Sequence, residues 1–190
     1  LAIHREAGSL SQEAITLYNL GILVSREGAL REAEAHYRAA LRIHRETGYR
    51  RGEGVVLTQL AELRKIAGEF DDAGAGYDAA LSIHREVGNR RFEGGTLTAI
   101  GELLAEQGRF AASLRTLEAG ECLLRDVGDT LALAKLLCVK GLAALAAADA
   151  ATARSALAEA ESIGARLGTL PSSELGGLIE ILRGSLSGAR

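Results

Sequence analysis

Apolar residues recur at spacings of three and four along most of the chain, which is the period of a helix with one buried face. The first such stretch predicts a helix over residues 12–27, and the second predicts a helix that begins near Ala29 and carries Leu30 and Tyr37. A glycine follows each stretch, at Gly28 and Gly48. Because glycine adopts a left-handed backbone at little cost, both positions are typical of helix ends. The pattern predicts a helical hairpin.

Small residues recur every forty positions along the chain, so the hairpin pattern repeats with a period of forty residues. One series is Gly8, Gly48, Gly88, Gly128 and Gly168; a second is Gly28, Gly68, Gly108 and Ala148; a third is Gly21, Ala61, Gly101 and Gly141. Self-similarity at a fixed period is typical of stacked repeat proteins, in which neighbouring units bury each other's apolar faces. The sequence therefore predicts four repeats of two helices each, over residues 9–48, 49–88, 89–128 and 129–168.

The two ends of the chain differ. Residues 1–8 (LAIHREAG) match the last turn of a second helix (LRIHRETG, residues 41–48), so we expect them to end a truncated preceding repeat, with further repeats before it. After Gly168, a proline and serines predict a turn, and apolar residues at helical spacing follow. We expect residues 169–190 to form a cap helix that covers the last repeat. The chain is then a single array over residues 1–190.

Composition supports an all-α fold and narrows the function. Aromatic residues make up 4% of the chain and only one proline is present, at Pro171. The net charge is −3 with both signs interspersed, which does not favour nucleic acid as a partner. No apolar run approaches the ~20 residues that cross a bilayer, so we expect no membrane partner. Two cysteines are too few for a disulfide framework, which favours a cytoplasmic protein.

The sequence His-Arg-Glu occurs three times, at His4, His44 and His84. Equivalent helices of stacked repeats lie at least ~8–10 Å apart, so three imidazoles in one column cannot converge on one metal ion. We interpret the phrase as the polar last turn of each second helix, where cations suit the helix dipole. No other residues combine a nucleophile with a base, and the Asp71–Asp72 pair suits a helix start. We expect no cofactor, no metal and no enzymatic activity.

One set of columns carries a family resemblance. It reads Leu17, Leu20, Gly21, Ala33, Tyr37, Ala40 in the first repeat and Leu57, Leu60, Ala61, Ala73, Tyr77, Ala80 in the second. This pattern resembles the tetratricopeptide repeat, in a long form similar to the arrays of spindle-orientation adaptors, kinesin light chains and bacterial signalling regulators. The resemblance implies a right-handed α-solenoid of stacked helix-turn-helix repeats with a C-terminal cap helix.

The resemblance also implies a binding groove lined by the first helix of each repeat. Carried over by register, the groove positions are Tyr18, Asn19 and Ile22, then Thr58, Gln59 and Glu62, then Thr98, Ala99 and Glu102, then Cys138, Val139 and Leu142. The groove is expected to be polar at its N-terminal end and apolar at its C-terminal end. The family's clamp for a C-terminal carboxylate, built from Lys and Asn, is not reproduced. The alternative is that these residues form a solvated polar face.

Three functions stay open on the sequence alone. The first is a scaffold that binds a peptide or partner protein in the groove. The second is a sensor or regulatory arm of a larger bacterial signalling ATPase, kinase or transcription regulator. The third is self-association through exposed repeat edges. The arginine pairs at residues 50–51 and 90–91 precede Glu53 and Glu93, and we interpret them as forming salt bridges between repeats rather than a site for an acidic partner.

Overall fold

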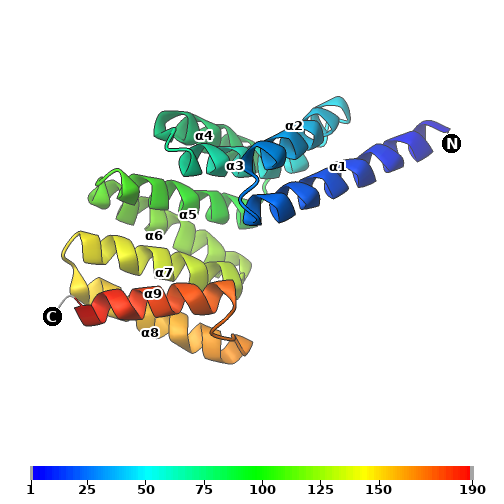
Figure 1. Cartoon of the computed structure of the whole chain (residues 1–190). Coiled ribbons are helices and arrows are strands. Elements are labelled where there is room, and N and C mark those ends of the chain that lie inside the picture. The colour runs from blue at the N-terminus through cyan, green and yellow to red at the C-terminus, as the bar shows by residue number, and fades with distance from the viewer. Residues whose placement is uncertain (1, 189–190) are drawn as a thin grey trace. The chain divides into compact units, whose positions relative to one another are not determined.

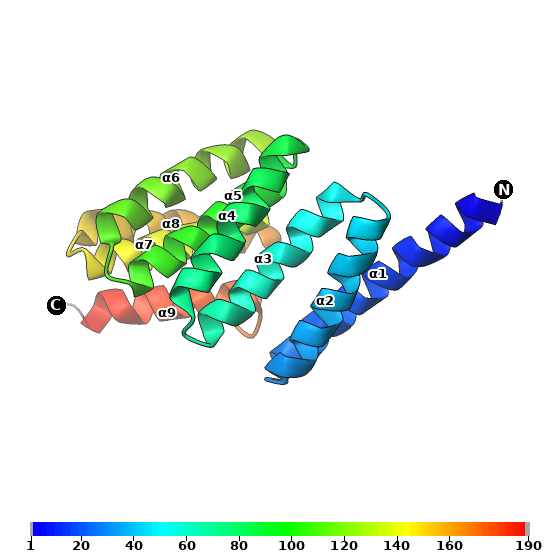
Figure 2. The ribbon, with the colours of Figure 1, turned by 90° about the horizontal axis from the view of Figure 1, so that it is seen from above.

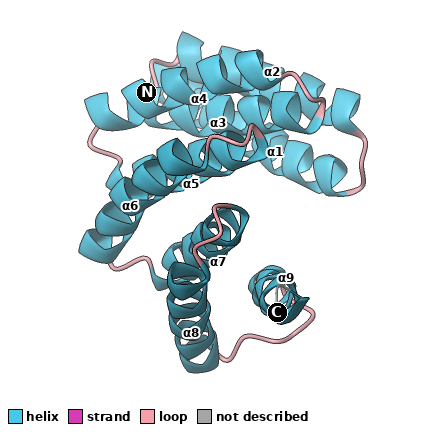
Figure 3. Ribbon diagram, turned by 90° about the vertical axis from the view of Figure 1, so that its left-hand side faces the viewer, coloured by secondary structure: helices cyan, strands magenta, loops and turns pink. Residues whose placement is uncertain are grey.

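The computed structural model describes residues 2–188, with side chains from residue 10 onward. Over this range the chain is entirely helical, with short loops and no strand (Figures 1 and 3). The all-α prediction is confirmed. Within residues 2–188 the nine helices are α1 (Ala2–Arg26), α2 (Leu30–Glu46), α3 (Arg50–Ile66), α4 (Phe70–Glu86), α5 (Arg90–Glu106), α6 (Phe110–Val127), α7 (Thr130–Ala146), α8 (Ala150–Leu167) and α9 (Glu174–Gly188).

Left-handed residues end the first eight helices. After α2, the Gly48 N–H donates to the Arg45 carbonyl at 3.2 Å and the Tyr49 N–H donates to the His44 carbonyl at 2.8 Å, the bond pattern of a Schellman motif. The prediction that the glycine series mark helix ends is confirmed at Gly28, Gly48, Gly68, Gly88, Gly108, Gly128 and Gly168, all with positive φ. Ala148 takes the same conformation, with φ of 61°.

The chain divides into two compact units, Leu1–Asn89 and Arg90–Arg190. In unit 1, α2 packs against both α1 and α3, and α3 packs against α4. Small residues let these helices approach closely. A Cβ atom on Gly21 would lie 2.5 Å from Tyr37 Cε1, and one on Gly76 would lie 2.9 Å from the Cβ of Ala61. Gly21 and Ala61, both of the third small-residue series, therefore lie at contacts between helices.

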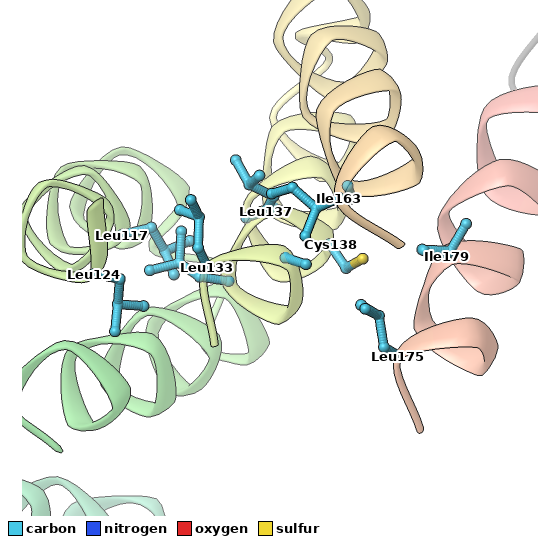
Figure 4. Packing of buried hydrophobic residues seen from close by; sticks show 12 residues of the cluster. Leu117, Leu124, Leu133, Leu137, Cys138, Ile163, Leu175 and Ile179 are labelled. Atoms are coloured by element: carbon cyan, nitrogen blue, oxygen red, sulfur yellow. The ribbon is translucent and has the colours of Figure 1, made fainter. Parts of the chain in front are cut away.

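Unit 2 has a larger apolar core, which Figure 4 shows. Leucines of α6 meet α7, and Ile163 of α8 and Ile179 of α9 close the same cluster. Helix α9 packs against both α7 and α8. Leu182 of α9 occupies the space that a side chain at Gly141 would need, since a Cβ there would lie 2.5 Å from Leu182 Cδ2.

Helix α1 differs from the prediction at its N-terminal end. The sequence predicts a helix end at Gly8, whereas α1 runs without interruption from Ala2 to Arg26 (Figure 2). Glycine permits the left-handed conformation but does not impose it, and within a helix it costs only about 1 kcal/mol relative to alanine. The side chain of His4 lies outside the described residues.

His44 and His84 stand in the last turn of α2 and α4, as the sequence predicts, but their rings are buried. His44 is 5% exposed and His84 is fully buried. Each ring fills space over a glycine of α3: a Cβ on Gly52 would lie 2.7 Å from His44 Nε2, and one on Gly54 would lie 2.7 Å from His84 Cε1. His44 also meets the Tyr49 ring edge-on, with centroids 5.3 Å apart. Burial lowers the pKa of His44.

Arg50, Arg90 and Arg91 form salt bridges, but of these only Arg91–Asp129 joins two repeats as predicted. In unit 1, Arg50 donates to Glu53 at 2.6 Å and to Glu86 at 2.6 Å, and Arg45 of α2 donates to Glu53 at 2.9 Å. Glu53 is buried, so its two arginine partners compensate the loss of hydration. In unit 2, Arg90–Asp126 is the counterpart of Arg50–Glu86, and Arg91 pairs with Asp129.

Candidate functional site: the first-helix surfaces

Six of the predicted groove positions lie in unit 1, on α1 and α3. We call them the unit 1 surface: Tyr18, Asn19, Ile22, Thr58, Gln59 and Glu62. Tyr18 is partly buried against Tyr37 of α2, with ring centroids 6.0 Å apart and planes tilted by 44°. Burial raises the pKa of Tyr18 and raises that of Tyr37 to about 12, so both phenols stay protonated near neutral pH. Asn19 is exposed.

Gln59 is the residue of this surface that the fold orients. Its Oε1 accepts a hydrogen bond from the Tyr37 hydroxyl at 3.5 Å, across the packing of α2 on α3. Its amide nitrogen has no protein partner among the described residues, and the side chain is partly exposed. An amide held by its oxygen presents two N–H donors outward.

Glu62 and Thr58 are engaged inside the protein. The Glu62 carboxylate accepts from the Tyr77 hydroxyl at 2.5 Å and pairs with Lys65 at 3.0 Å. The Thr58 hydroxyl donates to the Gly54 carbonyl of its own helix at 3.1 Å. These two residues can still accept from a ligand, but they are less free to rearrange than Asn19.

Two depressions of unit 1 lie apart from this surface. Depressions of about 390 and 400 Å³ lie between α2, α3 and the start of α4, and Glu34 and Arg64 line both. The Arg64 guanidinium there donates to Glu34 at 2.7 Å. No residue of the unit 1 surface lines either depression.

Unit 2 holds the remaining predicted positions. On α5, Thr98 donates to the Gly94 carbonyl at 3.0 Å, and Ala99 and Glu102 are partly exposed. On α7, Leu142 is partly exposed and Val139 packs against the unit 2 core.

The prediction that Cys138 lines an open groove was wrong. Its side chain is fully buried, in one cluster with Leu175 and Ile179 of α9 (Figure 4). Helix α9 packs on the face of α7 that was expected to form the apolar end of the groove. Burial raises the pKa of the Cys138 thiol to about 11, so it stays protonated near neutral pH.

The sequence did not lead us to predict that tyrosine hydroxyls form hydrogen bonds with residues of this site. Tyr37 and Tyr77 were assigned only to packing, yet their hydroxyls reach Gln59 and Glu62. A signal was available in the sequence, because a buried tyrosine needs a hydrogen-bond partner and the nearest polar groove positions could supply one.

Metal binding and membrane insertion find no support in the described residues. Over residues 10–188, no three His, Cys, Asp or Glu side chains gather closely enough to hold a metal ion. No helix of the described part of the chain is both long and apolar enough to cross a membrane.

The fold is that of helical repeat proteins. Among solved structures it is similar to aspartyl phosphate phosphatase F from Bacillus subtilis, with a TM-score of 0.79 and 13% identity over 94% of this chain and 49% of that one. It is also similar to BtubC (BKLC) from P. vanneervenii, with a TM-score of 0.69 and 19% identity over 83% of this chain and 65% of that one. The chain thus spans less than two thirds of either. No family model and no curated protein matches the sequence.

Proposed function

We propose that this chain is a tetratricopeptide-like segment of the long form, and that the unit 1 surface binds an extended peptide or a segment of a partner protein. The observation that carries the proposal is the Gln59 amide, whose Oε1 accepts a long, weak hydrogen bond from the Tyr37 hydroxyl at 3.5 Å and whose nitrogen has no partner among the described residues. Asn19 stands at the equivalent position of α1 and is exposed. Two amides in one column can pair with the backbone of an extended chain without reading its sequence.

Binding rather than catalysis is the function that these side chains support. The carboxylate of Glu62 is committed to Tyr77 and Lys65, and the phenols of the surface have raised pKa values. A general acid or base needs a pKa near the working pH. The residues of the unit 1 surface are therefore suited to hydrogen bonding.

A second candidate is a regulatory arm of a bacterial signalling protein. Its support is the likeness to aspartyl phosphate phosphatase F, which extends over 94% of this chain. The likeness is one of fold, so this candidate rests on analogy. It predicts that the segment alters the activity of a domain in the same polypeptide, which a comparison of that activity with and without the segment measures.

Selection of peptides from a displayed random library tests the groove. We expect the enriched peptides to bind the chain with a 1:1 stoichiometry, and the double variant Asn19→Ala/Gln59→Ala to weaken them about tenfold or more, since each lost amide pair is worth about 1 kcal/mol. Gln107→Ala, which removes an amide from the turn after α5, is the matched control. Peptides that bind the double variant as tightly as the parent chain would show that the surface is not the site.

A further inference from the structure

The imidazole of His44 fills a space that residue 52 leaves open. His44 lies in the last turn of α2 and is 5% exposed. A Cβ atom on Gly52 of α3 would lie 2.7 Å from His44 Nε2, so the ring occupies the space of a missing side chain. The Tyr49 ring covers the imidazole edge-on, with centroids 5.3 Å apart, and Tyr49 is itself 49% exposed. The imidazole is therefore buried near the surface, beneath a half-exposed side chain.

The buried carboxylate that acts on this imidazole is already paired with two arginines. It belongs to Glu53 of α3, and its oxygens accept from Arg45 of α2 at 2.9 Å and from Arg50 at 2.6 Å. Arg50 also pairs with the exposed Glu86 of α4 at 2.6 Å. Helix α1, which packs on α2 as well, carries Glu13, whose side chain is exposed. An imidazolium in this space would be a third cation beside one buried carboxylate.

Burial keeps the imidazole neutral. It lowers the pKa of His44, and the attraction of Glu53, which acts in the opposite direction, is the smaller effect. The neutral ring therefore prevails near pH 7, and the charged ring is disfavoured as long as it stays in this space. The end of α2 offers the charged ring a second position outside. A cation in the last turn of a helix interacts favourably with the helix dipole.

The second position requires no change in the backbone. Hydrogen bonds to the main chain hold the end of α2: the Tyr49 N–H donates to the His44 carbonyl at 2.8 Å, and the Thr47 hydroxyl donates to the Ile43 carbonyl at 2.8 Å. Neither bond involves the imidazole. The His44 side chain can therefore rotate outward past Tyr49 while the helix end keeps its bonds, and the space over Gly52 is then left without a side chain to fill it.

We propose that His44 is a pH-sensitive switch of unit 1: when the imidazole gains a proton it leaves the space over Gly52, and the contact between the end of α2 and the start of α3 opens. The stability that the neutral ring contributes is present above about pH 6.5, the pKa of an unfolded histidine, and is lost as the pH falls from there through the lowered folded-state pKa. Glu53 stays ionised in this range, because its own pKa is lowered from 4.5. The switch concerns packing alone and does not depend on peptide binding at the unit 1 surface.

Hydrogen exchange of the full chain, followed by mass spectrometry at about pH 7.5 and about pH 5.5, tests the switch. After correction for the intrinsic pH dependence of exchange, we expect the protection of residues 41–50 to fall at the lower pH in the parent chain. His44→Leu and His44→Phe should show no such fall, because neither new side chain takes up a proton. Each variant also changes the packing at the higher pH, so the quantity compared is the change in protection between the two pH values.

Two further variants serve as controls. His36→Gln removes the other histidine of α2, which is partly exposed and pairs with Glu32 at 3.7 Å, and this variant should retain the fall in protection. Tyr49→Ala uncovers the imidazole, so the midpoint of the His44 titration, measured by NMR, should move to higher pH. The signal that is missing in His44→Leu assigns the resonance. Circular dichroism checks that each variant remains helical.

Three results would overturn the proposal. The first is equal protection of residues 41–50 in the parent chain at both pH values. The second is a fall in protection that persists in His44→Leu and His44→Phe, which would assign it to another group, such as the buried His84. The third is a His44 resonance that titrates while its ring-current shift from Tyr49 stays unchanged, which would mean that the charged imidazole remains in the space over Gly52.

Discussion

Replacing Ala148 by glycine should stabilise unit 2. Ala148 follows α7 and has φ of 61°, where the equivalent residues after the first six helices and α8 are glycines. Its N–H donates to the Leu145 carbonyl at 2.9 Å, and the Asp149 N–H donates to the Ala144 carbonyl at 2.8 Å, the same bonds as at the glycine positions. The turn therefore imposes a left-handed backbone on an alanine.

The magnitude follows from two opposing terms. An L-residue in the left-handed conformation costs about 1–2 kcal/mol relative to the right-handed one, and glycine does not bear this cost. Glycine gives the unfolded chain more freedom, which offsets about 0.4–1 kcal/mol. Ala148 is exposed, so little packing is lost with its methyl group. The net gain in the free energy of unfolding should be about 0.5–1 kcal/mol.

Urea unfolding followed by far-UV circular dichroism measures this change. We expect Ala148→Gly to raise the midpoint without a change in the m-value. The reverse substitution in the same unit, Gly108→Ala, is the matched control: φ is 72° there and a Cβ atom would have nothing within 4 Å, so strain is the only cost. It should lower the midpoint by a similar amount. If Ala148→Gly lowered the midpoint while Gly108→Ala left it unchanged, backbone strain would not be what distinguishes these positions.

Three further substitutions or conditions test the packing and the electrostatics. Gly21→Ala should lower the free energy of unfolding by about 1–3 kcal/mol, because its Cβ would lie 2.5 Å from Tyr37 Cε1; urea titration checks it. Burial acts to raise the pKa of Glu53, but its bonds to two arginines outweigh burial and lower the pKa below its usual value. The stability that this carboxylate contributes is therefore present above about pH 4.5 and is lost as the pH falls through the lowered pKa. Glu53→Gln should flatten the acid limb of a curve of unfolding free energy against pH. Cys122 is exposed and should react with a thiol reagent in the folded chain, whereas the buried Cys138 should react only on unfolding, as mass spectrometry of the labelled peptides would reveal.

The backbone of this fold could be predicted because it depends on single residues at fixed spacing. A left-handed turn needs glycine, so the ends of most helices stand in the sequence as a series of glycines, and even the exception at Ala148 falls in register. Helix α1 shows the limit of that reasoning. Gly8 is in the same series, yet α1 continues through it, because glycine permits a helix end without requiring one.

The burial of the histidines could not be predicted from their own column. Whether an imidazole at the end of a second helix is exposed depends on a residue of another helix, since His84 fills the space over Gly54. Forty residues on, the same two columns hold Leu124 and Gly94, and a Cβ on Gly94 would lie 2.8 Å from Leu124 Cδ2. His84 over Gly54 and Leu124 over Gly94 are thus the same packing arrangement in successive repeats. It can be recognised in the sequence only when both columns are compared.

The candidate site was predictable only where no later helix covers a first helix. Asn19 is exposed and Gln59 is partly exposed, as their register implies, whereas Cys138, in the neighbouring column of Tyr18 and Thr58, is buried under α9. The amphipathic pattern of residues 174–188 predicted a covering helix, but the pattern does not specify which face of α7 it covers. That choice depends on Gly141, where the missing side chain admits Leu182.

Hydrogen bonding between repeats is less regular than their backbone. Tyr37 and Tyr77 occupy one column, yet Tyr37 donates to Gln59 of the following hairpin and Tyr77 donates to Glu62 of its own. The residue of α1 equivalent to Glu62 is Ile22, which cannot accept a hydrogen bond. Tyr37 therefore bonds to the next helix, at Gln59, whose amide nitrogen has no partner among the described residues. The difference between Ile22 and Glu62, at one position of two repeats, thus explains why Tyr37 bonds to the Gln59 amide of the unit 1 surface.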